Sequence, residues 1–131
     1  MMRRREFGFT MVELMIVMAI IVILVSIAIP QYQKAIIRAK ESVLQNNLFT
    51  LRQVIDEYTF DKKKAPQTLD DLVSAGYLRE IPMDPITNSN QTWKTIMEDM
   101  LQSVDQTEPG IYDVKSGSEK SGLNGTAYAD W

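Results

Sequence analysis

The first half of the chain carries a long apolar run that then changes into an amphipathic pattern. Within residues 14–29 the only polar side chain is Ser26, and Pro30 follows the run. A helix of about 20 apolar residues crosses a bilayer, because lipid offers exposed backbone groups no hydrogen-bond partner. The segment 9–30 reaches that length only if its single charged residue, Glu13, is included.

Residues 31–58 predict an amphipathic helix that continues the apolar one. Apolar side chains recur at spacings of three and four residues and form one stripe. The stripe comprises Tyr32, Ile36, Ala39, Val43, Leu44, Leu48, Leu51, Val54, Ile55 and Tyr58. We expect the rest of the C-terminal domain to cover this stripe. Pro30 lacks the N–H of a helical hydrogen bond, so it predicts either a kink or local opening there, or only the membrane exit.

The remaining chain predicts short elements joined by turns. Thr68 suits the N-cap of a short helix that Gly76 would end. Residues 110–115 have strand-like composition. Residues 116–131 are rich in Gly, Ser and Asn and end on Trp131, which we expect to pack into the domain.

Residues 92–104 carry two patterns at once. Six apolar residues have helical spacing, whereas Trp93, Thr95 and Met97 also alternate as in a strand. Periodicity alone slightly favours a helix over this stretch.

Composition narrows the function classes. The chain has 131 residues, no cysteine and no histidine, which removes disulfides, thiolate sites and the commonest general base. Its carboxylates are scattered, and no catalytic constellation is evident, so we do not expect an enzyme. The formal net charge of −3 argues against nucleic-acid binding.

Glu13 is the anomaly within the apolar run. A charge inside a membrane segment costs roughly 2.5–3.5 kcal/mol, so such a residue usually has a partner. Cleavage before Phe9 would create a positive amino terminus one helical turn away, or on a neighbouring copy. Three arginines at positions 3–5 precede this point and predict a cytoplasmic N-terminus.

The stretch 5–14, Arg-Glu-Phe-Gly-Phe-Thr-Met-Val-Glu-Leu, resembles the processing site of type IV pilins and type II secretion pseudopilins. In that family a prepilin peptidase removes a basic leader ending in Gly, the new terminal Phe is N-methylated, and a Glu stands at the fifth mature position. Gly8, Phe9 and Glu13 occupy these positions here. Loss of residues 1–8 removes three arginines and one glutamate and takes the net charge from −3 to −5.

The resemblance implies an α+β, pilin-like fold. A cleaved leader would occupy residues 1–8, a hydrophobic transmembrane and assembly helix residues 9–30, and a soluble head residues 31–131. The head would include the amphipathic half of the long helix, packed on a small antiparallel β-sheet, and would close with an irregular C-terminal loop. Pro30 matches a proline of the family, near which pilin helices can melt when they pack in a filament.

Two further stretches resemble the major pseudopilins in particular. Residues 77–85 match their "YL…IP.DP" connector, after which the family places a strand, so we expect a strand at about residues 92–98. Residues 112–119 look like the "YD..S.G.D" start of their calcium-binding loop. The absence of cysteine also fits that branch better than the many pilins that carry a C-terminal disulfide.

The resemblance of this tail implies calcium as the one candidate cofactor. Its oxygen ligands would come from Glu119, Asn124 and Asp130, together with backbone carbonyls. Lys120 departs from the aspartate-rich family loop and would repel a cation. The alternative is a loop held only by backbone hydrogen bonds and by Trp131.

The function implied is that of a structural filament subunit. The precursor would sit in the inner membrane with its leader cytoplasmic and its head periplasmic, and would be cut between Gly8 and Phe9. Copies would then form a helical homo-oligomer in which Glu13 neutralises the amino terminus of Phe9 on a neighbour. Implied partners are the prepilin peptidase, the inner-membrane assembly platform and minor pilins or pseudopilins.

Three alternatives stay open. The filament would be a type II secretion pseudopilus or, alternatively, a surface type IV pilus for adhesion or motility. A different class is a single-span anchored receptor or scaffold domain that is neither cleaved nor polymerised. An ordinary signal peptide, cut after Ser26-Ile27-Ala28, is disfavoured by the early glutamate and by the proline that follows.

Overall fold

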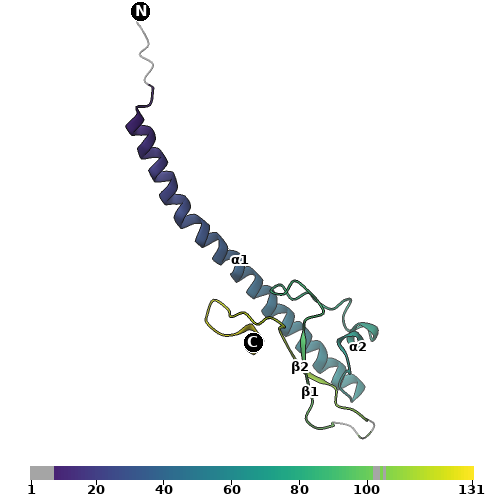
Figure 1. The fold of residues 1–131 in the computed structure, drawn as a ribbon. Coiled ribbons are helices and arrows are strands. Elements are labelled where there is room, and N and C mark those ends of the chain that lie inside the picture. The colour runs from purple at the N-terminus through teal and green to yellow at the C-terminus, as the bar shows by residue number, and fades with distance from the viewer. Residues whose placement is uncertain (1–7, 102–103, 105) are drawn as a thin grey trace, which may run out of the picture. The chain divides into compact units, whose positions relative to one another are not determined.

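A computed structural model describes residues 8–101, 104 and 106–131 of the chain. The three leader arginines lie outside the described residues. In chain order the elements are α1 (Met11–Lys62), α2 (Leu69–Ser74), β1 (Lys94–Met97), β2 (Ile111–Lys115) and the 3₁₀ helix η1 (Tyr128–Asp130) (Figure 1). A long N-terminal helix followed by a small antiparallel sheet confirms the predicted pilin-like α+β fold.

The chain divides into two compact units, one ending at Ile36 and the other beginning at Ile37. In the first unit every described residue is exposed, including the whole apolar run. Among the described residues, α1 is the one helix that is long and apolar enough to cross a membrane by length and composition. This half of α1 therefore presents an uncovered apolar surface.

The helix passes through Pro30 without interruption. The predicted local opening is therefore absent from the subunit. Pro30 cannot donate to the carbonyl of Ser26, four residues earlier, but one missing bond in a helix of 52 residues does not end it. The Ser26 hydroxyl donates to the carbonyl of Val22 at 2.7 Å, the back-bond to its own helix that the sequence predicted.

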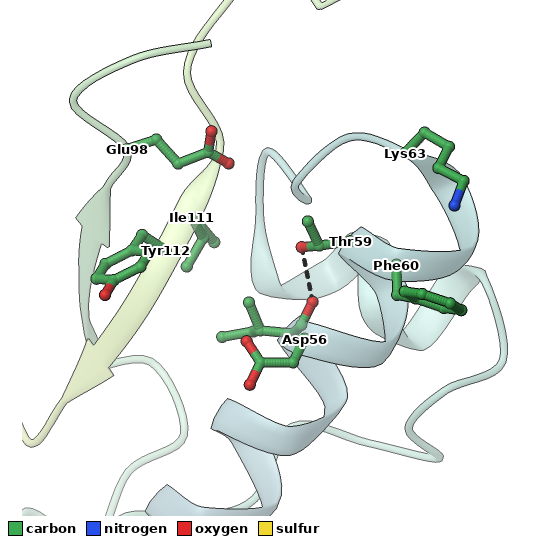
Figure 2. A pocket seen from close by; sticks show the side chains of 8 residues that line it. Asp56, Thr59, Phe60, Lys63, Glu98, Ile111 and Tyr112 are labelled. Carbon is green, nitrogen blue, oxygen red and sulfur yellow. Dashed lines mark hydrogen bonds between the residues drawn. The ribbon is translucent and has the colours of Figure 1, made fainter. Parts of the chain in front are cut away.

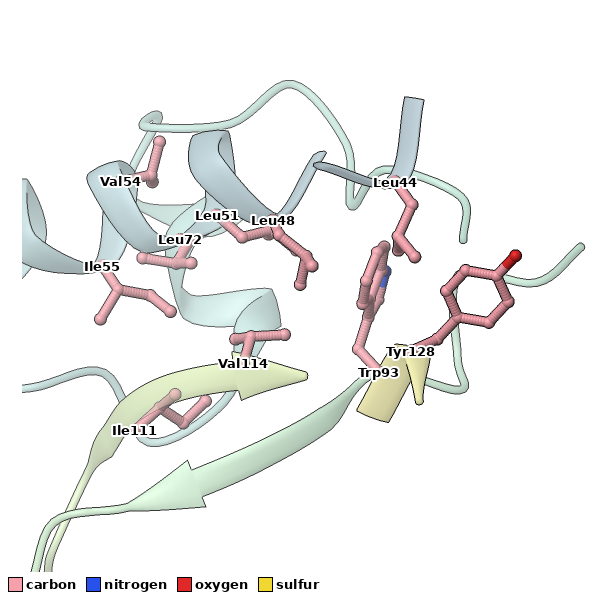
Figure 3. Close-up of a cluster of buried hydrophobic side chains, with 10 residues drawn as sticks. All are labelled: Leu44, Leu48, Leu51, Val54, Ile55, Leu72, Trp93, Ile111, Val114 and Tyr128. Carbon is pink, nitrogen blue, oxygen red and sulfur yellow. The ribbon is translucent and has the colours of Figure 1, made fainter. Parts of the chain in front are cut away.

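The second unit is built around one cluster of buried apolar side chains (Figure 3). The cluster comprises Leu44, Leu48, Leu51, Val54, Ile55, Leu72, Trp93, Ile111, Val114 and Tyr128. Five of its members come from α1, so the amphipathic half of the helix supplies one wall of the core. Trp131 packs against the cluster, as predicted.

The expected apolar stripe is wrong in its first part. Tyr32, Ile36 and Val43 remain 69%, 39% and 48% exposed, and the covered stripe begins only at Leu44. The described chain therefore leaves the stripe largely exposed before that point. The helix also continues past its predicted end, to Lys62.

The short helix α2 begins and ends as its sequence predicts. Thr68 is its N-cap residue, and Asp71 Oδ2 accepts the N–H groups of Thr68 and Gln67 at 3.1 and 2.9 Å. These contacts satisfy backbone donors that a helix start leaves without partners. Gly76 has φ +84°, which a side chain would disfavour, and it follows the last turn.

Both predicted strands form and pair antiparallel. The register shifts by one residue after Ile96, which leaves Tyr112 as a β-bulge. Strict alternation would turn Ile111 and Val114 to opposite faces of the sheet. The bulge instead allows both side chains to be buried, at 1% and 0% exposure. All four residues of β1 are exposed, so β2 supplies the sheet's share of the core.

Adjacent residues of α1 provide a matched test of this core. Leu48 is 2% exposed and Phe49 is 67% exposed. We expect Leu48→Ala to lower the free energy of unfolding by about 2–5 kcal/mol through the cavity it leaves. Phe49→Ala should change it by less than about 0.5 kcal/mol. Urea unfolding of the detergent-solubilised chain, followed by tryptophan fluorescence, measures both, and equal losses would contradict the assigned core.

Candidate processing and assembly site

The predicted cleavage bond lies in an accessible segment just before α1. Gly8, Phe9 and Thr10 have no helical assignment, and all three are exposed. Phe9 is 83% exposed, and a side chain at Gly8 would meet no atom within 4 Å. No described part of the subunit therefore requires glycine at position 8 for packing.

Glu13 lies in the first turn of α1 and forms a reciprocal cap with Thr10. The Thr10 N–H donates to Glu13 Oε2 at 3.2 Å, and the Glu13 N–H donates to Thr10 Oγ1 at 3.1 Å. This is the capping box, in which each side chain satisfies a backbone donor of the other residue. The carboxylate also lies where the helix dipole favours negative charge.

The role of Thr10 was missed in reading the sequence. The pattern Thr-x-x-Glu at residues 10–13, just before an apolar run, is the signal that identifies a capping box. The structure thus brings Glu13 to the N–H of Thr10, one residue from the amino group that cleavage before Phe9 would create. Pro30 lies seventeen residues further along α1 and takes no part in this local contact.

The candidate calcium ligands do not form a built site in the subunit. Glu119, Asn124 and Asp130 are exposed, and Asn124 Oδ1 already accepts from the hydroxyl and the N–H of Thr126, at 2.6 and 3.1 Å. Within the described residues no group of three His, Cys, Asp or Glu side chains could hold a metal. Calcium binding stays a prediction, and no step below depends on it.

Comparison with known proteins bears directly on this N-terminal site. Residues 3–29 match the prokaryotic N-terminal methylation motif. The chain is 31% identical over 107 residues to type II secretion system core protein G of Pseudomonas aeruginosa, an alignment that covers 70% of this chain and 75% of the relative. The chain belongs to the family of type IV pilins and type II secretion pseudopilins. Core protein G of Aeromonas hydrophila is 30% identical to this family member, over the same shares of both chains.

A second group of relatives lies among the pilins. The family member is 46% identical over 66 residues to the type IV major fimbrial protein FimA of Dichelobacter nodosus. That alignment covers 50% of this chain and 41% of the relative, so it is higher in identity but shorter than the match to core protein G. No solved structure gives a significant match.

In this pilin-family head, polar contacts fasten the C-terminal tail where no disulfide is available. Arg52 on α1 forms an ion pair with Asp113 at 2.8 Å and donates to the carbonyls of Val114 and Trp131, at 3.2 and 2.7 Å. One guanidinium therefore ties the helix to β2 and to the last residue. A planar group with five donors suits such a junction better than an ammonium would.

Glu41, nearer the start of the head, also joins α1 to the C-terminal tail. Its Oε1 accepts the N–H of Leu123 at 2.9 Å and the hydroxyl of Tyr128 at 2.8 Å. Burial and this hydrogen bond raise the pKa of Tyr128 to about 12. The ring of Tyr128 packs edge-on against Trp131, with 5.0 Å between ring centroids.

Asp84, in the predicted connector, is a buried structural carboxylate. It is 0% exposed, and its two oxygens accept from the hydroxyl of Ser116 at 2.6 Å and the N–H of Ile86 at 2.9 Å. It thus links the connector to the start of the tail. A "DP" pair alone predicts a turn and gives no sign of this long-range bond.

Tyr128 gives the head a testable dependence on alkaline pH. The unfolded chain releases this proton near pH 10 and the folded chain only near 12, so the folded state holds more protons in between. Stability therefore falls as pH rises from about 10 to about 12. We expect Tyr128→Phe to make that decline in stability smaller. Part of the decline should remain, because the hydrogen bond to Asp61 is the main cause that raises the pKa of Tyr77 to about 12 as well.

Urea midpoints of the full chain, measured between pH 9 and pH 12, provide the test. Tyr112→Phe, at an exposed position, is the matched control. An identical decline in wild type and Tyr128→Phe would contradict the contact with Glu41.

Proposed function

We propose that this chain is the major subunit of a type II secretion pseudopilus, made as an inner-membrane precursor and assembled after cleavage between Gly8 and Phe9. The observation that carries the proposal is an uncovered apolar helix with Glu13 in its first turn, on a chain whose similarity to core protein G covers 75% of that relative. Its role is structural and not catalytic.

The helix has two successive environments in this proposal. Before assembly its exposed apolar residues lie in the bilayer, where the helix satisfies most of its backbone N–H and C=O groups internally. After assembly the same residues pack against the helices of other copies. The leader arginines keep the N-terminus cytoplasmic and place the head in the periplasm.

Glu13 sets the register between copies. Cleavage creates an amino terminus at Phe9, and the carboxylate of a neighbouring copy pairs with it inside the apolar bundle. A copy in another register would leave both charges unpaired in a low-dielectric environment, which is costly. The prepilin peptidase, the inner-membrane assembly platform and the minor pseudopilins are the partners that such a pathway requires.

A surface type IV pilus is the second candidate, favoured by the 46% identity to the fimbrial protein of Dichelobacter nodosus. Deletion of the gene separates the two. A block in protein secretion supports the pseudopilus, and loss of long surface fibres with secretion intact supports the pilus. The length of the match to core protein G is why we propose the former.

Intact mass and N-terminal sequencing of the membrane-extracted protein test the processing step. We expect a chain that begins at methylated Phe9. A chain that keeps Met1, in cells with an active prepilin peptidase, would instead indicate a simple anchored domain. A start at Ile29 would indicate ordinary secretion.

Two substitutions at Glu13 separate its charge from its capping role. Glu13→Ala removes both, whereas Glu13→Gln keeps an oxygen that can accept the Thr10 N–H. We expect both to weaken assembly by roughly a hundredfold, because breaking a buried ion pair costs about 3 kcal/mol. Membrane insertion should stay intact or become easier. Sedimentation of sheared filaments and membrane fractionation measure the two outcomes.

Thr10→Ala serves as the control, since it removes the reciprocal hydrogen bond and leaves the carboxylate in place. It should assemble far better than either Glu13 variant. If Glu13→Gln assembled like wild type while Thr10→Ala failed, the cap and not the charge would be what assembly needs.

A further inference from the structure

Glu98 is a buried carboxylate without a partner. It follows the last residue of β1 and is 8% exposed, and each of its carboxylate oxygens exposes less than 1 Å². No donor among the described residues lies within hydrogen-bond distance of either oxygen. Such groups are rare in folded proteins because an unpaired buried charge is costly, so each one needs an explanation.

Glu98 lines a pocket of about 460 Å³ between the end of the sheet and the last turns of α1. Figure 2 shows Glu98, Ile111 and Tyr112 on the strand side, and Asp56, Thr59, Phe60 and Lys63 on the helix side. The pocket therefore carries two carboxylates and two aromatic rings. Its one cation, Lys63, lies over the ring of Phe60 at 4.6 Å from the ring centroid and forms no ion pair with Glu98.

An apolar surface adjoins this pocket. A second hollow of about 420 Å³ shares Glu98 and Tyr112 with the first and is otherwise lined by the residues on either side of Glu98 in the chain. Its exposed apolar members are Ile96, Met97, Met100 and Leu101, at 40%, 45%, 76% and 48% exposure. Exposed apolar patches often mark protein–protein interaction sites, and methionine is common at adaptable binding surfaces.

The same chain carries a complementary surface on α1. Residues 30–40 hold three cations and no acidic residue. Arg38, in this segment, is exposed, and its guanidinium has no hydrogen bond or ion pair to any described residue. Ile36 and Ile37 beside it are 39% and 36% exposed. A free guanidinium flanked by apolar side chains matches a free carboxylate flanked by apolar side chains.

We propose that Arg38 of a second copy of this chain enters the pocket at Glu98 and pairs with its carboxylate. Glu98 turns about its side-chain torsions to meet the cation, and Asp56 and Tyr112 flank the guanidinium. A planar guanidinium can contact both carboxylate oxygens at once and stacks on aromatic rings, so arginine suits this pocket better than lysine. The proposal rests on the filament function proposed above.

The two surfaces differ, so the contact they make is heterologous. A contact of this kind does not close on itself in a dimer but continues from copy to copy. Arg38 and Asp56 are eighteen residues apart on α1, which is about 27 Å along the helix. Copies inserted in one membrane share an orientation, so each Arg38–Glu98 contact offsets two parallel subunits by about that distance.

Glu98→Gln gives opposite results in the subunit and in the filament. In the solubilised subunit it removes an unpaired buried charge, so the thermal unfolding temperature should stay the same or rise. In the filament it removes the partner of Arg38, so pelleted filament should fall about tenfold or more. A lower unfolding temperature, or failure to fold, would show that Glu98 supports the subunit itself and would overturn the proposal.

A double-mutant cycle tests the pairing itself. Arg38→Gln should reduce assembly as much as Glu98→Gln, and the double variant should lose little more than either one. Arg79→Gln is the matched control, because Arg79 is also exposed and has no hydrogen bond or ion pair among the described residues. Losses that simply add in the double variant, or equal losses from Arg79→Gln, would overturn the pairing.

Cross-linking locates the contact while leaving both charges in place. The chain has no cysteine, so Ala39→Cys and Asp99→Cys, each beside one member of the pair, introduce the only thiols. A short bismaleimide should link copies in filaments of this double-cysteine variant, and most of that product should be lost when Glu98→Gln is added. Ala39→Cys with Ser74→Cys is the control pair. A wild type that forms no filament would overturn the proposed function, whereas filaments without the Ala39–Asp99 product would overturn this contact alone.

Discussion

The N-terminal half of α1 needs a cover that the described chain does not supply. Its apolar side chains are exposed from Met11 to Ile29, and fully burying a single residue of this kind contributes about 1.5–3 kcal/mol. A helix with such a surface is stable in lipid or against like helices, and not in water. Membrane insertion and polymerisation are thus two ways of removing the same apolar surface from water. The head is attached to this helix in both states.

Some charged side chains of this protein have partners within the described subunit, and others do not. Arg52, Glu41 and Asp84 are satisfied within the head by short contacts to the tail and connector. Those contacts fix the C-terminal loop in a chain that has no cysteine. Glu98 and Arg38 have no partner among the described residues. The first set stabilises the subunit, and under the proposed contact the second set pairs between subunits.

Sequence pattern predicted most of the elements and few of the contacts between them. Its preference for a helix over residues 92–104 was wrong, and the strand at Lys94–Met97 was predicted only from the family resemblance. The 3.6-residue period identified the buried stripe from Leu44 onward because those residues share one helix face, but no period reports where the cover begins. The bulge at Tyr112 could not be predicted, since it depends on how β1 and β2 align. The partners of Asp84 and Arg52 are residues far away in sequence, which only the folded chain brings close. The capping box of Thr10 and Glu13 was local and could have been found.

That capping box bears on how processing and assembly are linked. In the uncut chain Phe9 contributes an ordinary amide, so the Thr10 N–H is the group that Glu13 satisfies. Cleavage would place a charged ammonium one residue away, and its full positive charge attracts the carboxylate more strongly than the partial charge of an amide N–H does. An ammonium on another copy competes with the Thr10 N–H for Glu13 more strongly still once water is excluded around it. An ammonium left without a partner in such a site is costly. Under the proposed function, removal of the leader therefore does more than free the helix: it creates the partner for which Glu13 gives up its local cap.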